Sequence, residues 1–102
     1  MKFDVIPGFR AAYRISGDEV TKVKGEDVNI NMKKLVEIIR QNAKIGDEEA
    51  KKLDMGTLLG FAMILDDLGI AYMGGYIVFV DALKTNWNKV LEAFKEVVTN
   101  EN

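Results

Sequence analysis

The segment from residue 58 to residue 83 constrains the fold more than any other part of this 102-residue chain. It contains no lysine or arginine, and its only charged side chains are Asp66, Asp67 and Asp81. Its apolar residues occupy consecutive positions, as in YIVFV at 76–80, so a strand built from them is apolar on both faces. Such a strand needs a cover on each face, and the rest of the chain must provide both covers.

A membrane-spanning helix does not account for this segment. A spanning helix needs about 20 continuous apolar residues, whereas Asp66 and Asp67 interrupt the run near its middle and three glycines follow them. Each charge would cost roughly 2.5–3.5 kcal/mol at the bilayer centre. The segment instead predicts three short strands, at 58–65, 70–73 and 76–82, with turns at DDLG and GG.

The composition narrows the possible functions. The chain has no cysteine and no histidine, which excludes disulfides, thiolate nucleophiles and zinc–thiolate sites and removes the commonest general base. The net charge of -2 predicts no broad basic surface for nucleic acid or anionic lipid. The N-terminal MKFDVIPGF lacks the apolar core of a signal peptide. We therefore expect a cytoplasmic, non-enzymatic protein that needs no cofactor or metal and binds neither nucleic acid nor membrane.

The N-terminal part predicts a hairpin. GFRAAYRIS at 8–16 alternates with a period of two, which indicates a strand with Phe9, Ala11, Tyr13 and Ile15 on one face. GD at 17–18 is a two-residue turn signal, and EVTKVKG at 19–25 then returns as a more polar strand. Lysine side chains on this second strand would protect an exposed sheet edge against pairing with another chain.

Helical periodicity appears twice. Asn31 is a suitable N-cap for a helix to about Ile45, and Gly46 is expected as its C′ residue. Asp47 would then cap a further short helix through Leu53. Near the C-terminus, Thr85 or Asn86 is expected to cap a helix over 86–98, whose apolar stripe begins at Trp87.

These elements predict one α+β domain over residues 1–102. Its order is β-β-α-β-β-β-α, and its five-stranded antiparallel sheet lies between the helices at 31–45 and 86–98. The two helices supply the covers that the apolar strands require.

The element order and four sequence stretches resemble the roadblock / dynein light chain superfamily, whose domains have a profilin-like sandwich, and most closely its small prokaryotic branch. The stretches are IPGFRAAYRIS at 6–16, LLGFAMI at 58–64, GGYIVFVDA at 74–82 and NWNKVLEAF at 86–94. Two features depart from better-known members. The helix that usually precedes the first strand is reduced to five or six residues, and the connection at 46–57 is long and charged.

The resemblance implies a non-catalytic homodimeric protein-interaction module that regulates a small GTPase or serves as a scaffold. It implies that the strand at 58–65 pairs with its twofold mate and that the helix at 31–45 packs against its mate. The interface residues implied in this way are Leu58, Leu59, Phe61, Met63, Leu65, Leu35 and Ile39. The uncharged strand fits that role, because an unguarded apolar edge favours pairing with another strand.

A small-molecule sensor is the alternative function, with Tyr13, Tyr72 and Phe79 lining a pocket beside the sheet. Arg10 and Arg14 share a face of the first strand and could bind a small anion or an acidic partner, although solvated strand residues are the simpler interpretation.

The remaining candidates have structural explanations. The Asp66–Asp67 pair fits a turn better than a cation site. GDEE at 46–49 fits the acidic first turn of a helix, and MGG at 73–75 fits a tight hairpin better than a phosphate loop. Core packing is the favoured role of Trp87 and of most of the methionines near the sheet, Met55, Met63 and Met73.

Overall fold

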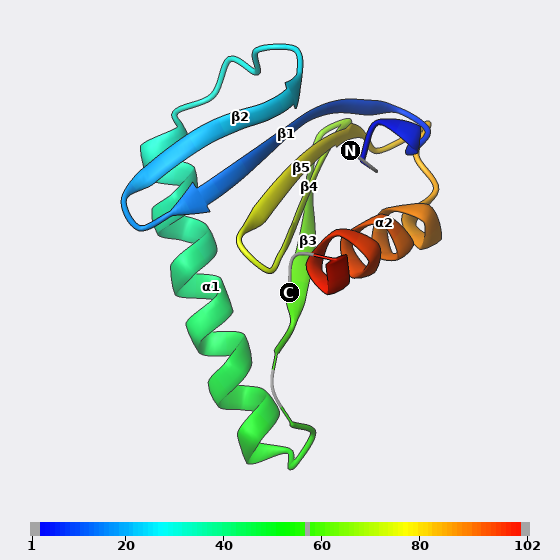
Figure 1. Cartoon of the computed structure of the whole chain (residues 1–102). Coiled ribbons are helices and arrows are strands. Elements are labelled where there is room, and N and C mark those ends of the chain that lie inside the picture. Colours follow the sequence, from blue (N-terminus) through cyan, green and yellow to red (C-terminus); the bar gives the residue numbers. More distant parts are fainter. Residues whose placement is uncertain (1–2, 57, 101–102) are drawn as a thin grey trace.

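A computed structural model describes residues 3–56 and 58–100, and it confirms the α+β fold and the order β-β-α-β-β-β-α (Figure 1). A short 3-10 helix precedes the first strand. The elements are η1 (Phe3–Val5), β1 (Phe9–Ser16), β2 (Glu19–Gly25), α1 (Met32–Lys52), β3 (Gly60–Leu65), β4 (Leu68–Met73), β5 (Tyr76–Asp81) and α2 (Trp87–Asn100). No helix in the described residues is long and apolar enough to cross a membrane.

The five strands form one antiparallel sheet in the order β2-β1-β5-β4-β3. Three tight turns of two residues each join β1 to β2, β3 to β4, and β4 to β5. Glycines with positive φ occupy the first and last of these turns, at Gly17, Gly74 and Gly75, as two-residue hairpins require. The centre of the sheet is therefore β5, whereas β2 and β3 are its two edges.

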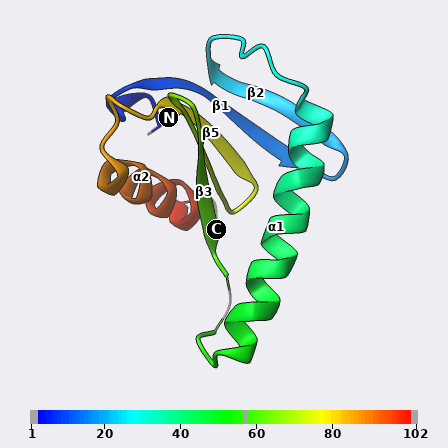
Figure 2. The same ribbon diagram turned by 180° about the vertical axis from the view of Figure 1, so that it is seen from behind.

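Each face of the sheet has its own core, and one helix covers each (Figures 1 and 2). On the α2 side, Tyr76, Val78 and Val80 pack with residues of η1 and α2. On the α1 side, Ile77 and Phe79 pack with residues of α1. The prediction that the strand at 76–82 is buried on both faces is confirmed, and all five residues at 76–80 are buried.

The reduced N-terminus still fills part of the α2 face. Phe3 is fully buried, with its ring centroid 5.5 Å from that of Tyr76 and 5.1 Å from that of Phe94. Ile6 packs in the same cluster. One aromatic side chain thus provides cover that a longer N-terminal helix could otherwise supply.

The prediction of two helices between residues 31 and 53 is wrong. Asn31 does cap the helix, since its Oδ1 accepts from Lys34 N at 3.1 Å, but α1 continues without a break to Lys52. Gly46 lies inside the helix, and the side chain of Leu58 occupies the space beside it, where a Cβ would come within 2.9 Å of Leu58 Cδ2. Past this point α1 extends beyond the end of the sheet (Figure 1).

Two strand details also differ from the sequence prediction. A bulge in β1 between Phe9 and Ala11 moves Phe9 to the α2 face, where it packs against the first core rather than alongside Ala11 and Tyr13. The third strand begins at Gly60, so Leu58 and Leu59 precede it. The α2 helix is capped by Asn86, whose Oδ1 accepts from two backbone N–H groups of the first turn at 3.0 and 3.2 Å.

Candidate functional site

The two edges of the sheet have opposite chemistry. On β2, Lys24 Nζ lies 2.5 Å from Asp4 Oδ2 and Lys22 Nζ lies 2.6 Å from Asp27 Oδ1. The hydrogen bond from Lys24 lowers the pKa of Asp4, and the hydrogen bond to Asp27 raises the pKa of Lys22. The strand β3, in contrast, has the sequence GFAMIL and carries no charged or polar side chain. The exposed, unguarded edge is therefore β3.

The side chains of β3 alternate between the two faces. Phe61 and Met63 are half-buried and pack against the α1-side core. On the opposite face Ala62 is exposed, and Ile64 is 57% exposed. Leu65, at the end of the strand, is also exposed. An apolar edge with exposed side chains on both faces is a surface suited to protein association.

The α1 helix adds to this surface, but not with the residues that the resemblance implies. Leu35 and Ile39 are 4% and 1% exposed and belong to the chain's own core. The exposed apolar residues of the helix are Ile38 and Ile45, at 47% and 57%. These two residues were missed by the sequence reasoning, although their spacing of seven places them on one helix face.

The segment between α1 and β3 is strongly apolar and partly anchored. Leu53, Met55 and Leu59 are exposed. Met63 and Met73 pack against the two cores, which confirms the core role expected for most of the methionines, and Met55 is the exception. Leu58 is half-buried, and its N–H donates to Asp47 Oδ1 at 3.1 Å. This bond, together with Lys51 Nζ at 3.1 Å from Asp47 Oδ2, lowers the pKa of Asp47.

A cleft of about 280 Å³ separates α1 from β3. Its walls are mainly apolar, with Ile30, Leu35 and Ile38 on the helix side and Met63 and Leu65 on the strand side. The cleft joins the exposed face of α1 to the edge strand, so the two apolar surfaces are continuous.

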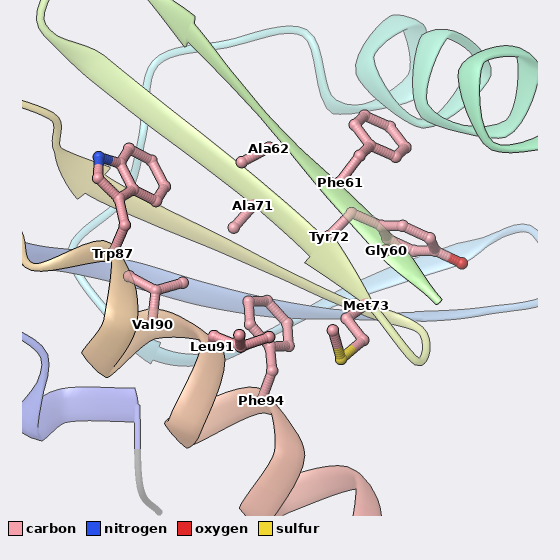
Figure 3. A pocket seen from close by; sticks show the side chains of 10 residues that line it. All are labelled: Gly60, Phe61, Ala62, Ala71, Tyr72, Met73, Trp87, Val90, Leu91 and Phe94. Atoms are coloured by element: carbon pink, nitrogen blue, oxygen red, sulfur yellow. The ribbon is translucent and has the colours of Figure 1, made fainter. Parts of the chain in front are cut away.

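A second hollow of about 210 Å³ lies on the opposite face, between β3–β4 and α2 (Figure 3). Its lining includes no charged side chain; Gly60, Ala62 and Ala71 come from the sheet, and Leu91 and Phe94 come from α2. We call this hollow the α2 groove.

The α2 groove ends at Trp87, whose role is mixed. Its ring lies over Gly69, where a Cβ would come within 2.8 Å of Cη2, and it packs against the α2-side core as expected. Because it is half-buried and lines the groove, it also forms part of the surface. The small residues beneath Trp87 and Leu91 leave the space for the hollow. The sequence reasoning missed them, although small residues on adjacent strands are a signal that could have revealed it.

The pocket expected for a sensor is not formed by the expected residues. The rings of Tyr13 and Phe79 pack edge to face at 5.5 Å between centroids and are both buried in the α1-side core. Tyr72 lines the α2 groove, with its hydroxyl directed away from the groove (Figure 3). The three residues do not enclose a common cavity.

The two arginines of β1 have partners within the chain. Arg10 Nε lies 2.7 Å from Glu26 Oε1. Arg14 Nη1 lies 3.4 Å from the hydroxyl of Tyr76, and its Cζ is 5.5 Å from the centroid of that ring. Both guanidinium groups therefore have interaction partners within the chain.

The acidic candidates also have structural roles. Asp66 and Asp67 form the two-residue turn after β3, and Asp66 has a φ of 58°. The GDEE stretch lies inside α1, where Asp47 pairs with Lys51 and Glu49 pairs with Lys52. Over residues 3–56 and 58–100 no three acidic side chains gather in a way that could hold a metal ion.

Comparison with family models, curated proteins and solved structures finds no match to the chain. The resemblance to the roadblock superfamily therefore rests on the element order and the four sequence stretches alone. The surface formed by β3, the exposed face of α1 and the intervening segment is the strongest candidate site on the described residues.

Proposed function

We propose that this protein is a non-catalytic, homodimeric protein-interaction module of the roadblock type. The observation that carries the proposal is the uncharged edge of β3, which continues into the exposed face of α1 through an apolar cleft. In the dimer, β3 pairs antiparallel with β3 of a second copy. The exposed Ile38 and Ile45 then pack against the same helix of the second copy.

Burial of this surface explains why the chain tolerates so many exposed apolar side chains on one side. Ile38, Ile45, Leu59, Ile64 and Leu65 all lie on β3, α1 or the segment between them. Exposed apolar groups gain roughly 25 cal/mol per Å² when they leave water. Pairing also supplies partners for the open backbone groups of the edge strand.

Light scattering coupled to gel filtration tests whether the protein is a dimer. A monomeric mass at micromolar concentration would contradict the proposal. Ile64→Lys is a cleaner test variant than a change at Phe61 or Met63, because those two side chains pack against the chain's own core. Val5→Lys is the matched control, since Val5 is an exposed apolar residue on η1 at 73%. We expect Ile64→Lys to give a folded monomer and Val5→Lys to remain dimeric.

The partner beyond the second copy follows from the resemblance: a small GTPase or a scaffold protein. The outer face of α1 offers charged groups for such a contact, including the exposed Lys33, Glu37 and Lys44. Binding of a purified small GTPase from the same cell, measured by interferometry, should weaken as salt rises, because exposed charges are screened. Salt-independent binding would contradict a contact through this face.

Small-molecule sensing is the second candidate, and the α2 groove is the observation that favours it. Apolar cavities of about 150 Å³ can bind a molecule the size of benzene, so a groove of about 210 Å³ has room for a small uncharged ligand. Native mass spectrometry of freshly purified protein distinguishes the candidates. A retained small molecule supports sensing, whereas a clean dimer supports the interaction module.

A further inference from the structure

The turn after β3 determines which backbone groups reach the open edge. In a two-residue hairpin the residues that flank the turn, here Leu65 and Leu68, form a hydrogen-bonded pair. Hydrogen-bonded and non-hydrogen-bonded pairs then alternate along the two strands. The N–H and C=O groups of Gly60, Ala62 and Ile64 therefore point away from β4, toward a potential partner strand.

The same three residues face the α2 side of the sheet, with the side chains of Ala62 and Ile64 and the bare Cα of Gly60. Gly60 and Ala62 line the α2 groove, and Ile64 lies opposite Gly69 at the far end of the strand. Along this face the strand therefore presents two small residues, Gly60 and Ala62, followed by one large residue, Ile64. A second copy running antiparallel brings its large residue toward the small ones.

Only two registers pair nearly all of the strand with its mate. Residues opposite each other in a sheet lie on the same face. In a twofold pair, each even-numbered residue must therefore lie opposite an even-numbered residue, and each odd-numbered residue opposite an odd-numbered one. For a strand of Gly60–Leu65, the twofold axis then passes through Ala62 or through Met63.

The hydrogen bonds favour the axis at Ala62. Each hydrogen-bonded pair exchanges two bonds. With the axis at Ala62, all three outward-facing residues, Gly60, Ala62 and Ile64, find a partner among the same three residues of the second copy. With the axis at Met63, Gly60 loses its strand partner and lies opposite Asp66 of the second copy.

Steric fit and charge favour the same axis. With the twofold axis at Ala62, Ile64 of the second copy lies beside Gly60, on the open side of the uncharged α2 groove. Asp66 of the second copy then lies opposite Leu58, which precedes β3 and does not line the groove. With the twofold axis at Met63, Asp66 of the second copy would instead lie opposite Gly60, at the groove, where its carboxylate would lose hydration without gaining a partner.

We infer that the second copy completes the α2 groove: the twofold axis passes through Ala62, and Ile64 of each copy fills the open side of the groove of the other beside Gly60. This inference rests on the proposed dimer and adds its register and the occupant of the groove. In each half of the dimer, the groove then binds a side chain of the other copy.

Single-cysteine variants test the register, because the chain has no cysteine of its own. With the axis at Ala62, the two copies of residue 62 have Cα atoms about 5.5 Å apart, within the range that a disulfide spans. The two copies of residue 63 are then roughly 8 Å apart, which exceeds that range. Under mild oxidation we expect Ala62→Cys to give at least tenfold more cross-linked dimer than Met63→Cys.

The possible outcomes separate the inference from the proposed function. Faster cross-linking of Met63→Cys would overturn the register but leave the β3 dimer intact. No cross-linking of either variant in a protein that light scattering shows to be dimeric would overturn the register and move the interface off β3. A monomeric wild type would overturn the proposed function and the inference with it.

Ile64→Ala tests the occupant of the groove. Its side chain is 57% exposed in the single chain, so we expect the circular dichroism spectrum to stay unchanged while the dimer dissociation constant rises about tenfold. An unchanged constant would remove Ile64 from the interface. A small apolar molecule retained by the wild-type dimer in native mass spectrometry would assign the groove to that ligand instead.

Discussion

The strands β2 and β3 are both edges of one sheet, yet they carry opposite chemistry. All residues of β2 except Val20 are exposed, most of them are polar, and its lysines are paired with acidic groups from neighbouring segments. The strand β3 exposes only apolar side chains. This difference indicates that the β2 edge is protected against pairing with another strand, whereas the β3 edge is not.

The largest effect is expected from a charge placed on β3, because it gives this edge the charged character of β2. In the proposed dimer Ile64→Lys buries an ammonium without a partner, so we expect the dissociation constant to rise at least 100-fold, about 3 kcal/mol. Sedimentation equilibrium measures this change. The matched substitution on the other edge is Val23→Lys, at a bulged and exposed position of β2, and equal weakening by both would contradict the contrast.

Removal of the charges from β2 tests the same comparison from the other side. With Lys22→Val and Lys24→Val, β2 loses its protecting charges and should begin to pair with β2 of another dimer. Because each dimer then has two such edges, we expect open-ended chains of dimers that associate weakly, with a dissociation constant of about 1 mM. A light-scattering mass that stays constant with concentration would show that β2 is protected by something other than its lysines.

The apolar face of α1 is expected to contribute less than β3. Ile38→Ser together with Ile45→Ser removes two half-exposed side chains from the proposed interface. We expect the dimer to weaken roughly tenfold, or about 1.4 kcal/mol, in sedimentation equilibrium. The control Val5→Ser should have no effect, and a dimer unaffected by the double change would confine the interface to β3.

The smallest effect is expected at the anchor between α1 and the start of β3. Asp47→Ala removes the acceptor of the Leu58 N–H and should lower the thermal midpoint near neutral pH. Since the folded chain lowers the pKa of Asp47 from 3.8, its contribution is present above that pH and is lost as the pH falls through the lower folded value. The midpoints of variant and wild type should therefore converge below pH 3.8, and a constant difference across pH would contradict this account.

Local sequence rules predicted the strands and hairpins better than the end of the first long helix. The alternation of β1 and the two-residue GD turn predicted the N-terminal hairpin, and the doubly apolar run at 76–80 predicted a covered central strand. The end of the first long helix was mispredicted, because Gly46 is a normal C-terminal signal in the sequence. In the structure Gly46 instead provides space for Leu58, a contact with a distant residue that local rules do not contain.

The candidate site shows the same limit. The absence of charge at 58–65 is a local property, and the structure places this uncharged strand at an edge of the sheet. Which apolar residues of α1 remain exposed depends on the angle at which the helix crosses the sheet, so Leu35 and Ile39 were chosen where Ile38 and Ile45 are exposed. The bulge that moves Phe9 to the other face likewise has no signature in an alternating sequence.

The pairing of β1 with β5 has a consequence for how the chain folds. The hairpin β1–β2 and the three-strand unit β3–β4–β5 are each local, and only the β1–β5 contacts join them into one sheet. Contacts so distant in sequence form slowly, because a long loop must close first. During synthesis the hairpin and α1 leave the ribosome with one face uncovered and cannot be completed until β5 follows. The lysines of β2 protect one edge of this half-finished sheet, while the edge of β1 stays open until β5 pairs with it.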